Sequence, residues 1–279
     1  MTAANNALPV PSGATPTVVS SIRQASRATS IDFGMLMAQA KQESGFRVDA
    51  KASTSSATGL FQFINATWLS LVQRYGGKYG VGKLAQQITT DPAGRVSVAD
   101  PAVREGILDL RKDVKLSAAL AAEYARANKG EIESALGRPA GNADLYLAHF
   151  LGAGGATALL KAVTHNGDAV GAALLPRAAV ANRGVFYDES GQARTVAQIY
   201  QAFAQRIDGE AQRFSTADTR NAGPPAAAAT DVPAFISRLG FHGQQLSQPM
   251  VTMLNAFALS ALQLLANPKP FVAPDRRAV

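Results

Sequence analysis

Apolar side chains recur at helical spacing through most of the chain between residues 17 and 207. Phe33, Leu36, Met37 and Ala40 occupy positions i, i+3, i+4 and i+7, which is one face of an α-helix. The same spacing predicts further helices near residues 18–25, 65–75, 101–114, 116–130, 145–152 and 195–207. The alternation typical of strands is nearly absent, and its best example is the short stretch 95–98. The pattern therefore predicts an all-α domain.

Polar and glycine residues mark where several of these helices begin and end. Asp100 followed by Pro101 is a helix start, because an N-cap carboxylate precedes a proline in the first turn. We expect Asn65 and Thr195 to cap two other helices in the same way. Gly45 is suited to end the helix that begins near residue 33.

Shifts in composition divide the chain into five segments. Asn, Pro, Ser and Gly dominate the N-terminal end, and Gly, Pro and an Ala run follow the last periodic helix. We therefore expect a flexible arm at residues 1–16 and the all-α domain at 17–207. A linker at 208–232, a C-terminal helical segment at 233–266 and a flexible tail at 267–279 should follow.

The longest apolar run, residues 250–266, contains no charged residue. At 1.5 Å per residue a helix of this length spans about 26 Å, less than the ~30 Å hydrocarbon core of a bilayer. Thr252, Asn255 and Gln263 lie toward one side of such a helix. This run predicts a docking helix that packs on the all-α domain or on another protein, and an ordinary C-terminal core helix remains an alternative.

Composition narrows the classes of partner and cofactor. Hydrophobic residues make up 47% and charged residues 17% of the chain, so most of it is expected to fold. The net charge of +7 favours anionic partners, but Lys and Arg are scattered and no recognition helix is visible, which argues against nucleic acid. Cysteine is absent and the three histidines form no metal-ligand motif, so neither a metal nor a cofactor is expected. The first residues also lack the pattern of a signal peptide.

Two glycine-rich stretches come close to nucleotide-binding motifs. Residues 77–84 lack the Ser or Thr that follows the lysine of a phosphate-binding loop, and a helix is expected before them. Residues 152–156 lack the third glycine of a dinucleotide fingerprint. We interpret the first as a surface loop and the second as a tight turn between helices that approaches a ligand.

Glu43 is the outstanding candidate for chemistry. It lies three residues after Ala40, so it continues the apolar face of its helix into the last turn. Partial burial and the negative end of the helix dipole both disfavour its charged form and raise its pKa. A carboxyl group that stays protonated near neutral pH suits a general acid, although a solvated glutamate at a helix end fits the spacing equally well.

The residues that follow Glu43 favour the chemical interpretation. Residues 50–63 are rich in small and hydroxyl side chains, including Ser53, and Gly59 permits backbone angles that other residues avoid. Gln62 stands between two phenylalanines, where its amide suits a sugar that bears N-acetyl groups.

Glu43-Ser44, the serine-rich loop and Gly59-Leu60-Phe61-Gln62 together resemble the catalytic motif of soluble lytic transglycosylases, whose catalytic domain has the goose-type lysozyme fold. The resemblance covers roughly residues 20–165. It implies a lysozyme-like helical domain with a C-terminal helical extension. It also makes Glu43 the catalytic residue and places Ser44, Gly59 and Gln62 in the substrate site.

The second motif of that family is altered in this chain. Its nearest counterpart is the stretch from Tyr146 through His149 to Gly154, and both Tyr146 and Tyr124 are candidates for the tyrosine near the catalytic glutamate. With Ser53 and His149, these residues complete the expected substrate-binding set.

No second carboxylate faces Glu43 by any spacing argument, because Asp91, Asp100 and Asp109 suit turns, caps or solvent. Hydrolysis of this type generally uses two carboxylates. The single carboxylate therefore favours a lytic transglycosylase, and the resemblance implies cleavage of the bond between N-acetylmuramic acid and N-acetylglucosamine with a 1,6-anhydromuramic product. We expect a monomer that acts in the periplasm or outside the cell. A flagellar rod or secretion-system protein is a possible partner for its C-terminal segment. A muramidase and a weakly active wall-binding module remain the alternatives.

Overall fold

The computed structural model of the protein describes residues 13–53 and 55–220. In these residues the chain is mostly helical, which confirms the predicted all-α class. The elements are α1 (Pro16–Thr29), α2 (Phe33–Ser44), α3 (Asn65–Tyr75), α4 (Gly82–Ala85), β1 (Ile88–Thr90), β2 (Val96–Val98), α5 (Pro101–Asp109), the 3-10 helix η1 (Leu110–Lys112), α6 (Val114–Leu136), α7 (Asn142–His165), α8 (Gly171–Leu174), α9 (Pro176–Ala181), α10 (Arg183–Phe186) and α11 (Val196–Arg220).

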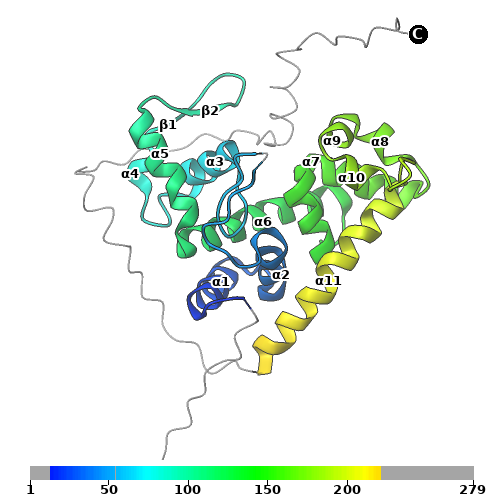
Figure 1. Ribbon diagram of the computed structural model, residues 1–279, viewed down its shortest axis with the longest axis horizontal. Helices are drawn as coiled ribbons and strands as arrows, with labels where there is room; N and C mark the ends of the chain where they lie inside the picture. The colour runs from blue at the N-terminus through cyan, green and yellow to red at the C-terminus, as the bar shows by residue number, and fades with distance from the viewer. Residues whose placement is uncertain (1–12, 54, 221–279) are drawn as a thin grey trace, which may run out of the picture.

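The helices form two groups joined through α6 (Figure 1). One group contains α3 to α5 with the β1–β2 hairpin, and the other contains α7 to α10. Helix α6 packs against α1 and α7, while α11 runs along the edge of the molecule and packs against α2 and α7. The arrangement brings the C-terminal end of α2 toward α7.

A buried aromatic and aliphatic core holds α3 in place. Trp68 is fully buried, and its indole Nε1–H donates to the backbone oxygen of Ile107 at 2.7 Å. Leu71 and Val72, on the same face of α3, are fully buried as well. This face of α3 is therefore part of the core. Further fully buried side chains are Phe61, Phe63, Leu36, Leu120 and Phe186.

Most of the predicted helix ends are confirmed. Asp100 accepts hydrogen bonds from the first-turn amides of α5, and Gly45 ends α2 in the left-handed conformation (φ 59°). Thr195 caps α11 by accepting from the Gln198 amide at 3.2 Å. Asn65 is not a cap: it is the first residue of α3, and its side-chain oxygen instead accepts a hydrogen bond from Arg111.

The elements differ from the prediction in other places as well: the helix predicted at 101–114 ends as α5 at Asp109, and the one predicted at 145–152 is part of the longer α7. Helix α6 does not stop near Gly130 but continues to Leu136, because Ile132 is fully buried on the same face and extends its apolar stripe. The stretch 95–98 does contain a strand, β2, and it pairs with β1 in an antiparallel hairpin. The hairpin is too short to change the fold class.

Helix α11 is the main correction to the predicted segments. We expected a linker from residue 208, but the helix continues to Arg220 because Ala211 and Phe214 are buried on its inner face. Gly34 of α2 allows the two helices to touch, since a Cβ atom there would lie 2.0 Å from the Ala211 oxygen. At the other end of the chain, α1 begins at Pro16 with Thr15 as its cap, inside the arm predicted for residues 1–16.

Other predicted segments lie outside the described residues. They are most of the N-terminal arm, the linker beyond residue 220, the helical segment 233–266 with its apolar run 250–266, and the tail 267–279. Among the helices of residues 13–220, none has the length and apolar character needed to cross a bilayer.

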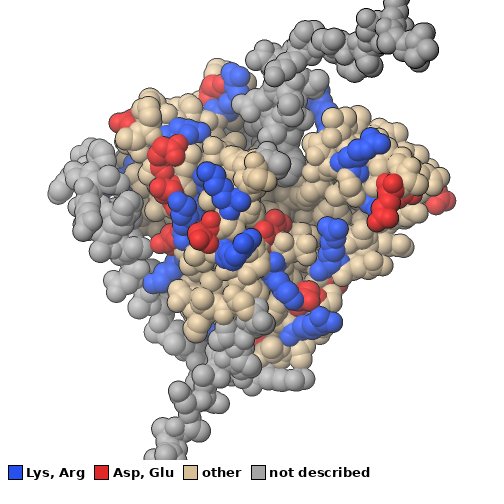
Figure 2. Space-filling model, in the orientation of Figure 1, with Lys and Arg blue, Asp and Glu red and all other residues tan. Residues whose placement is uncertain are grey.

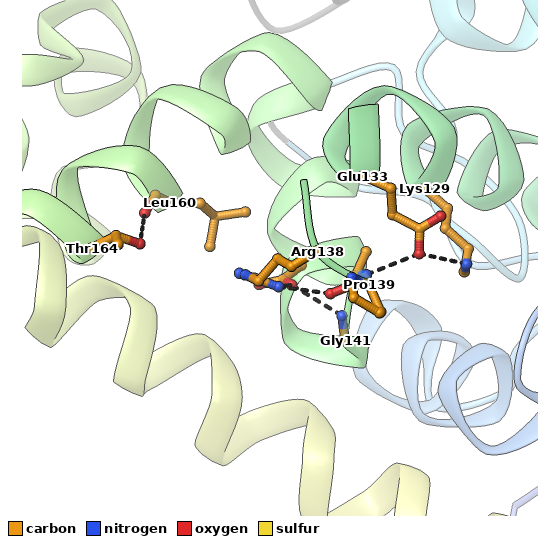
Figure 3. Close-up of polar contacts among 9 residues, drawn as sticks. Lys129, Glu133, Arg138, Pro139, Gly141, Leu160 and Thr164 are labelled. Carbon is orange, nitrogen blue, oxygen red and sulfur yellow. Dashed lines mark hydrogen bonds and ion pairs between the residues drawn. The ribbon is translucent and has the colours of Figure 1, made fainter. Parts of the chain in front are cut away.

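The turn between α6 and α7 is fixed by two carboxylates (Figure 3). Glu133 accepts from Lys129 Nζ at 2.6 Å and from the Ala140 amide at 3.0 Å. Asp144, buried in the first turn of α7, accepts from Arg138 at 2.6 Å and from the Gly141 amide at 3.0 Å. These contacts set where α7 begins and therefore how its first half faces α2.

Candidate functional site

Glu43 lies in the last turn of α2, where Gly45 ends the helix. Its side chain is only 21% exposed. Burial raises the pKa of this carboxyl from 4.5 to about 7. The group is therefore protonated in a large share of molecules at neutral pH and can both donate and accept a proton.

Tyr146, in the first half of α7, is the tyrosine that reaches Glu43. Its hydroxyl donates a hydrogen bond to the Glu43 carboxyl, which opposes part of the rise in the pKa of Glu43. Burial of the ring, and after it the charge and hydrogen bond of Glu43, raise the pKa of Tyr146. Tyr124 of α6 is buried and interacts with Asn128, and burial raises its pKa to about 12. Of the two candidate tyrosines, the structure brings Tyr146 to Glu43.

His149 lies one turn after Tyr146 and also meets Glu43. Its Nε2 atom is 3.6 Å from Oε1 of Glu43. The imidazole is packed between aromatic rings: Tyr146 lies parallel to it at 6.4 Å, while Tyr124 and Phe63 approach edge-on at 6.1 and 6.3 Å. Burial lowers the pKa of His149 to about 4, so the imidazole is neutral at physiological pH and this contact is not an ion pair.

The loop between α2 and α3 folds back on itself beside Glu43. Isolated antiparallel bridges join Lys51 to Thr58 and Thr58 to Phe63. Gly59 is required at its bend, because its φ is +85° and a Cβ atom there would lie 2.3 Å from the Arg111 backbone oxygen. The glycine predicted from the motif thus has a steric reason.

Ser44 and Gln62, which were predicted to bind substrate, form hydrogen bonds with the backbone of the protein. The Ser44 hydroxyl is buried and lies 2.9 Å from the backbone oxygen of Leu60, so it ties the loop to the end of α2. The amide nitrogen of Gln62 donates to the oxygens of Ala50 at 3.1 Å and Gly59 at 2.9 Å. Both amide protons are used within the loop, and only the Gln62 oxygen is left to meet a ligand.

Gln62 also adopts a left-handed backbone conformation, with φ at 49°. Such a conformation is uncommon for a side chain of this size, and the two hydrogen bonds of its amide group hold it. The neighbouring rings of Phe61 and Phe63 are buried in the core and so do not flank a ligand. Ser53, in contrast, is exposed on the outer part of the loop.

Arg111 is a residue of this region that the sequence did not reveal. It is buried, with 8% of its surface exposed, and its guanidinium Nη1 donates to the backbone oxygens of Ser56 at 2.7 Å and Phe63 at 3.1 Å. Nη1 also contacts the Asn65 side-chain oxygen at 2.9 Å, and Nε donates to the Leu108 oxygen. Its own burial lowers the pKa of Arg111. The sequence pointed to this contact only through Asn65, which was predicted as a helix cap and whose side-chain oxygen accepts a hydrogen bond from Arg111.

The second glycine-rich stretch interrupts α7. Gly152 has φ 71° and ψ 168°, a conformation that is essentially restricted to glycine, so α7 is two helical pieces that meet at this residue. The predicted tight turn between helices is therefore present. The first stretch, 77–84, follows helix α3, and its Lys78 forms an ion pair with the buried Glu123 at 2.6 Å. This is a structural contact rather than a phosphate site.

In the described part of the chain no group of His, Asp and Glu side chains is arranged to hold a metal ion. The shift in the pKa of Glu43 has two causes, burial and the Tyr146 hydroxyl, and no neighbouring carboxylate contributes. Figure 2 shows that the surface is hollowed between the two groups of helices, with Lys and Arg scattered among acidic residues. The arrangement is one largely buried carboxyl group with a raised pKa, in contact with a tyrosine and a neutral histidine.

A comparison with protein families gives one finding for this chain. Residues 20–99 match the family model described as the transglycosylase SLT domain. The matched segment begins within α1 and includes α2 with Glu43, the loop with Gly59 and Gln62, α3, α4 and the β1–β2 hairpin. Tyr146 and His149 lie beyond the matched residues.

Proposed function

We propose that the protein cleaves the β-1,4 bond between N-acetylmuramic acid and N-acetylglucosamine. The match of residues 20–99 to the transglycosylase SLT domain supports lytic transglycosylase-type activity toward peptidoglycan. The proposed product is a 1,6-anhydromuramic acid end, and water is not consumed. The proposed catalytic residue is Glu43. The observation that carries this proposal is the partly buried carboxyl group of Glu43, whose pKa is raised to about 7 and on which no carboxylate of the described residues acts.

In the first half of the proposed reaction Glu43 acts as the general acid. Its carboxyl proton moves to the glycosidic oxygen while the bond from that oxygen to C1 of the muramic acid breaks. The pKa of about 7 keeps the proton available at neutral pH. The N-acetyl group of the substrate stabilises the positive charge that develops at C1, so that the protein does not need a second carboxylate for this purpose.

In the second half Glu43 acts as the general base. The carboxylate takes the proton of the C6 hydroxyl group, and O6 forms the new bond to C1, which closes the anhydro ring and restores protonated Glu43. The Tyr146 hydroxyl, which donates to the Glu43 carboxyl, stabilises the carboxylate between the two proton transfers. Hydrolysis would instead require a second carboxylate at roughly 5–5.5 Å or 6.5–9.5 Å to act as nucleophile or to activate water.

Mass spectrometry of the products from purified peptidoglycan tests this proposal. We expect soluble fragments with 1,6-anhydromuramic ends from the wild-type protein and none from Glu43→Gln. Glu105→Gln is the matched control, because its side chain is 71% exposed on α5, and it should behave like the wild type. Reducing ends would show a muramidase, and binding to the wall without soluble products would show a binding module.

The substrate also bears on where the protein acts. Peptidoglycan lies outside the cytoplasm, so we propose a periplasmic or extracellular site of action and local opening or remodelling of the wall. We propose that the C-terminal segment after residue 220 docks the enzyme onto a protein of a flagellar rod or secretion apparatus. Ser53, Gly59 and Gln62 stay proposed members of the substrate site, and a monomer stays the proposed assembly.

A further inference from the structure

The arrangement around His149 calls for an explanation that substrate binding does not give. Its imidazole lies against the proposed catalytic carboxyl group, with Nε2 of His149 3.6 Å from Oε1 of Glu43. Three aromatic rings surround the imidazole, and its side chain is 16% exposed. A side chain packed in this way presents little surface to a sugar, and its polar edge is directed at Glu43.

We propose that His149 is a positioning residue for Glu43, whose neutral imidazole presents Nε2–H to the carboxyl group as a second hydrogen-bond donor beside Tyr146. This inference rests on the function proposed above and deepens it. Tyr146 and His149 lie three residues apart on α7, so they share one face of the helix and approach the same carboxyl group. The distance of 3.6 Å is long for a hydrogen bond, and contacts of this kind commonly tighten when the substrate is bound.

The donor form of His149 follows from the proton balance of the reaction. If Nε2 carried a lone pair instead, it would accept the very proton that Glu43 must give to the glycosidic oxygen. With a proton on Nε2, the imidazole cannot take it, and it stabilises the carboxylate that exists between the two transfers. His149 itself neither gains nor loses a proton in either step.

The aromatic surroundings explain why the imidazole stays neutral. A cationic imidazole 3.6 Å from Glu43 would stabilise the carboxylate and lower the pKa of Glu43, which would weaken it as an acid. The groups that face His149 are Glu43 from α2, Tyr124 from α6, Tyr146 from α7 and Phe63 from the loop. Arg206 of α11 acts electrostatically on Tyr146. Burial among these groups lowers the pKa of His149 to about 4.

Histidine side-chain NMR on the intact wild-type protein tests the tautomer directly. The chain has three histidines, His149, His165 and His242, so the long-range 1H–15N correlations are few and a His149→Phe spectrum assigns them. We expect His149 to stay neutral in the Nε2–H form between pH 5.5 and pH 8. A proton on Nδ1 alone, or titration of His149 within this range, would overturn the inference.

Kinetics on purified peptidoglycan supply the second measurement. His149→Phe keeps an aromatic ring and removes the donor, and we expect kcat to fall about tenfold with little change in KM. The alkaline limb of the kcat profile should also move to higher pH, because Glu43 loses a donor to its carboxylate. His149→Gln places an amide N–H near the position of Nε2 and should restore most of the activity. His165→Phe, an exposed residue at the end of the same helix, is the control and should match the wild type.

The outcomes separate this inference from the proposed function. If the wild-type protein releases anhydro products but His149→Phe matches it in kcat and pH profile, the inference is wrong and the function stands. An increase in KM alone would show that His149 binds substrate instead. If the wild-type protein releases no anhydro product, the proposed function fails, while the NMR spectra still report whether His149 donates to Glu43.

Discussion

Glu43→Gln should change the stability of the protein in a pH-dependent way as well as remove its activity. Burial raises the pKa of Glu43 from 4.5, its value in the unfolded chain, to about 7 in the folded protein. Between these two values the folded state holds a proton that the unfolded state has lost. The free energy of unfolding therefore falls as the pH rises through this window. Glutamine is never charged and carries no such penalty.

The size of the effect follows from the difference between the two pKa values. Each pKa unit corresponds to about 1.4 kcal/mol, so ionisation of Glu43 destabilises the folded wild-type protein by about 3 kcal/mol above pH 7. At pH 4.5 the penalty is nearly absent. Relative to the wild type, Glu43→Gln should thus gain about 3 kcal/mol of stability between pH 4.5 and pH 8.

Urea unfolding of both proteins at pH 4.5, 6 and 8 measures this gain. The exposed Glu105→Gln serves as the reference, because its stability relative to the wild type should stay nearly constant over the same range. Our interpretation of Glu43 as a buried, strained carboxyl group is wrong if the difference between Glu43→Gln and the wild type is the same at all three pH values. It is equally wrong if purified Glu43→Gln keeps near-normal turnover.

Three further substitutions test the surroundings of Glu43. Tyr146→Phe removes a donor to the carboxylate, so the alkaline limb of kcat should move to higher pH with a smaller loss of turnover than in Glu43→Gln; an unchanged limb would contradict the contact. Gln62→Ala removes two hydrogen bonds within the loop and should lower the free energy of unfolding by about 1–3 kcal/mol in urea titrations, again with a smaller loss of turnover than in Glu43→Gln. Wild-type kinetics of that variant on intact sacculi would remove Gln62 from the site. Trp68→Ala should cost about 3–5 kcal/mol in the same titrations, and a stable variant that has lost substrate binding would show instead that Trp68 contacts the sugar.

The features predicted well from the sequence are those that depend on neighbours along the chain. Helical spacing and the caps at Asp100, Thr195 and Gly45 are local, and each reappears in the structure. The position of Glu43 on the inner face of the last turn of α2 was also local, and it was enough to predict a raised pKa. No partner from a distant segment was needed for any of these predictions.

The features that were missed depend on contacts between distant segments. Spacing did not distinguish Tyr146 from Tyr124, because the choice depends on how α7 crosses α2. The hydroxyl of Ser44 and the amide of Gln62 suggested ligand contacts, but backbone oxygens of the loop take their hydrogen bonds. Arg111, which lies 48 residues after Phe63, holds the loop from a segment with no motif of its own. The end of α11 was missed because its inner face is defined by α2.

The packing of α11 against α2 affects the order in which a newly synthesised chain can complete its fold. Asp32, at the start of the helix that carries Glu43, accepts a hydrogen bond from Ser215, which is 183 residues later in the chain. Lys41 pairs with Glu210 across 169 residues, and Arg23 with Asp218 across 195. Because the ribosome synthesises the chain from its N-terminus, α2 cannot pack against α11 until almost all of the described chain has been made. Helix α2, which carries Glu43, is thus among the first segments to be synthesised and among the last to be fully enclosed by its neighbours. A nascent chain therefore carries Glu43 without its complete surroundings.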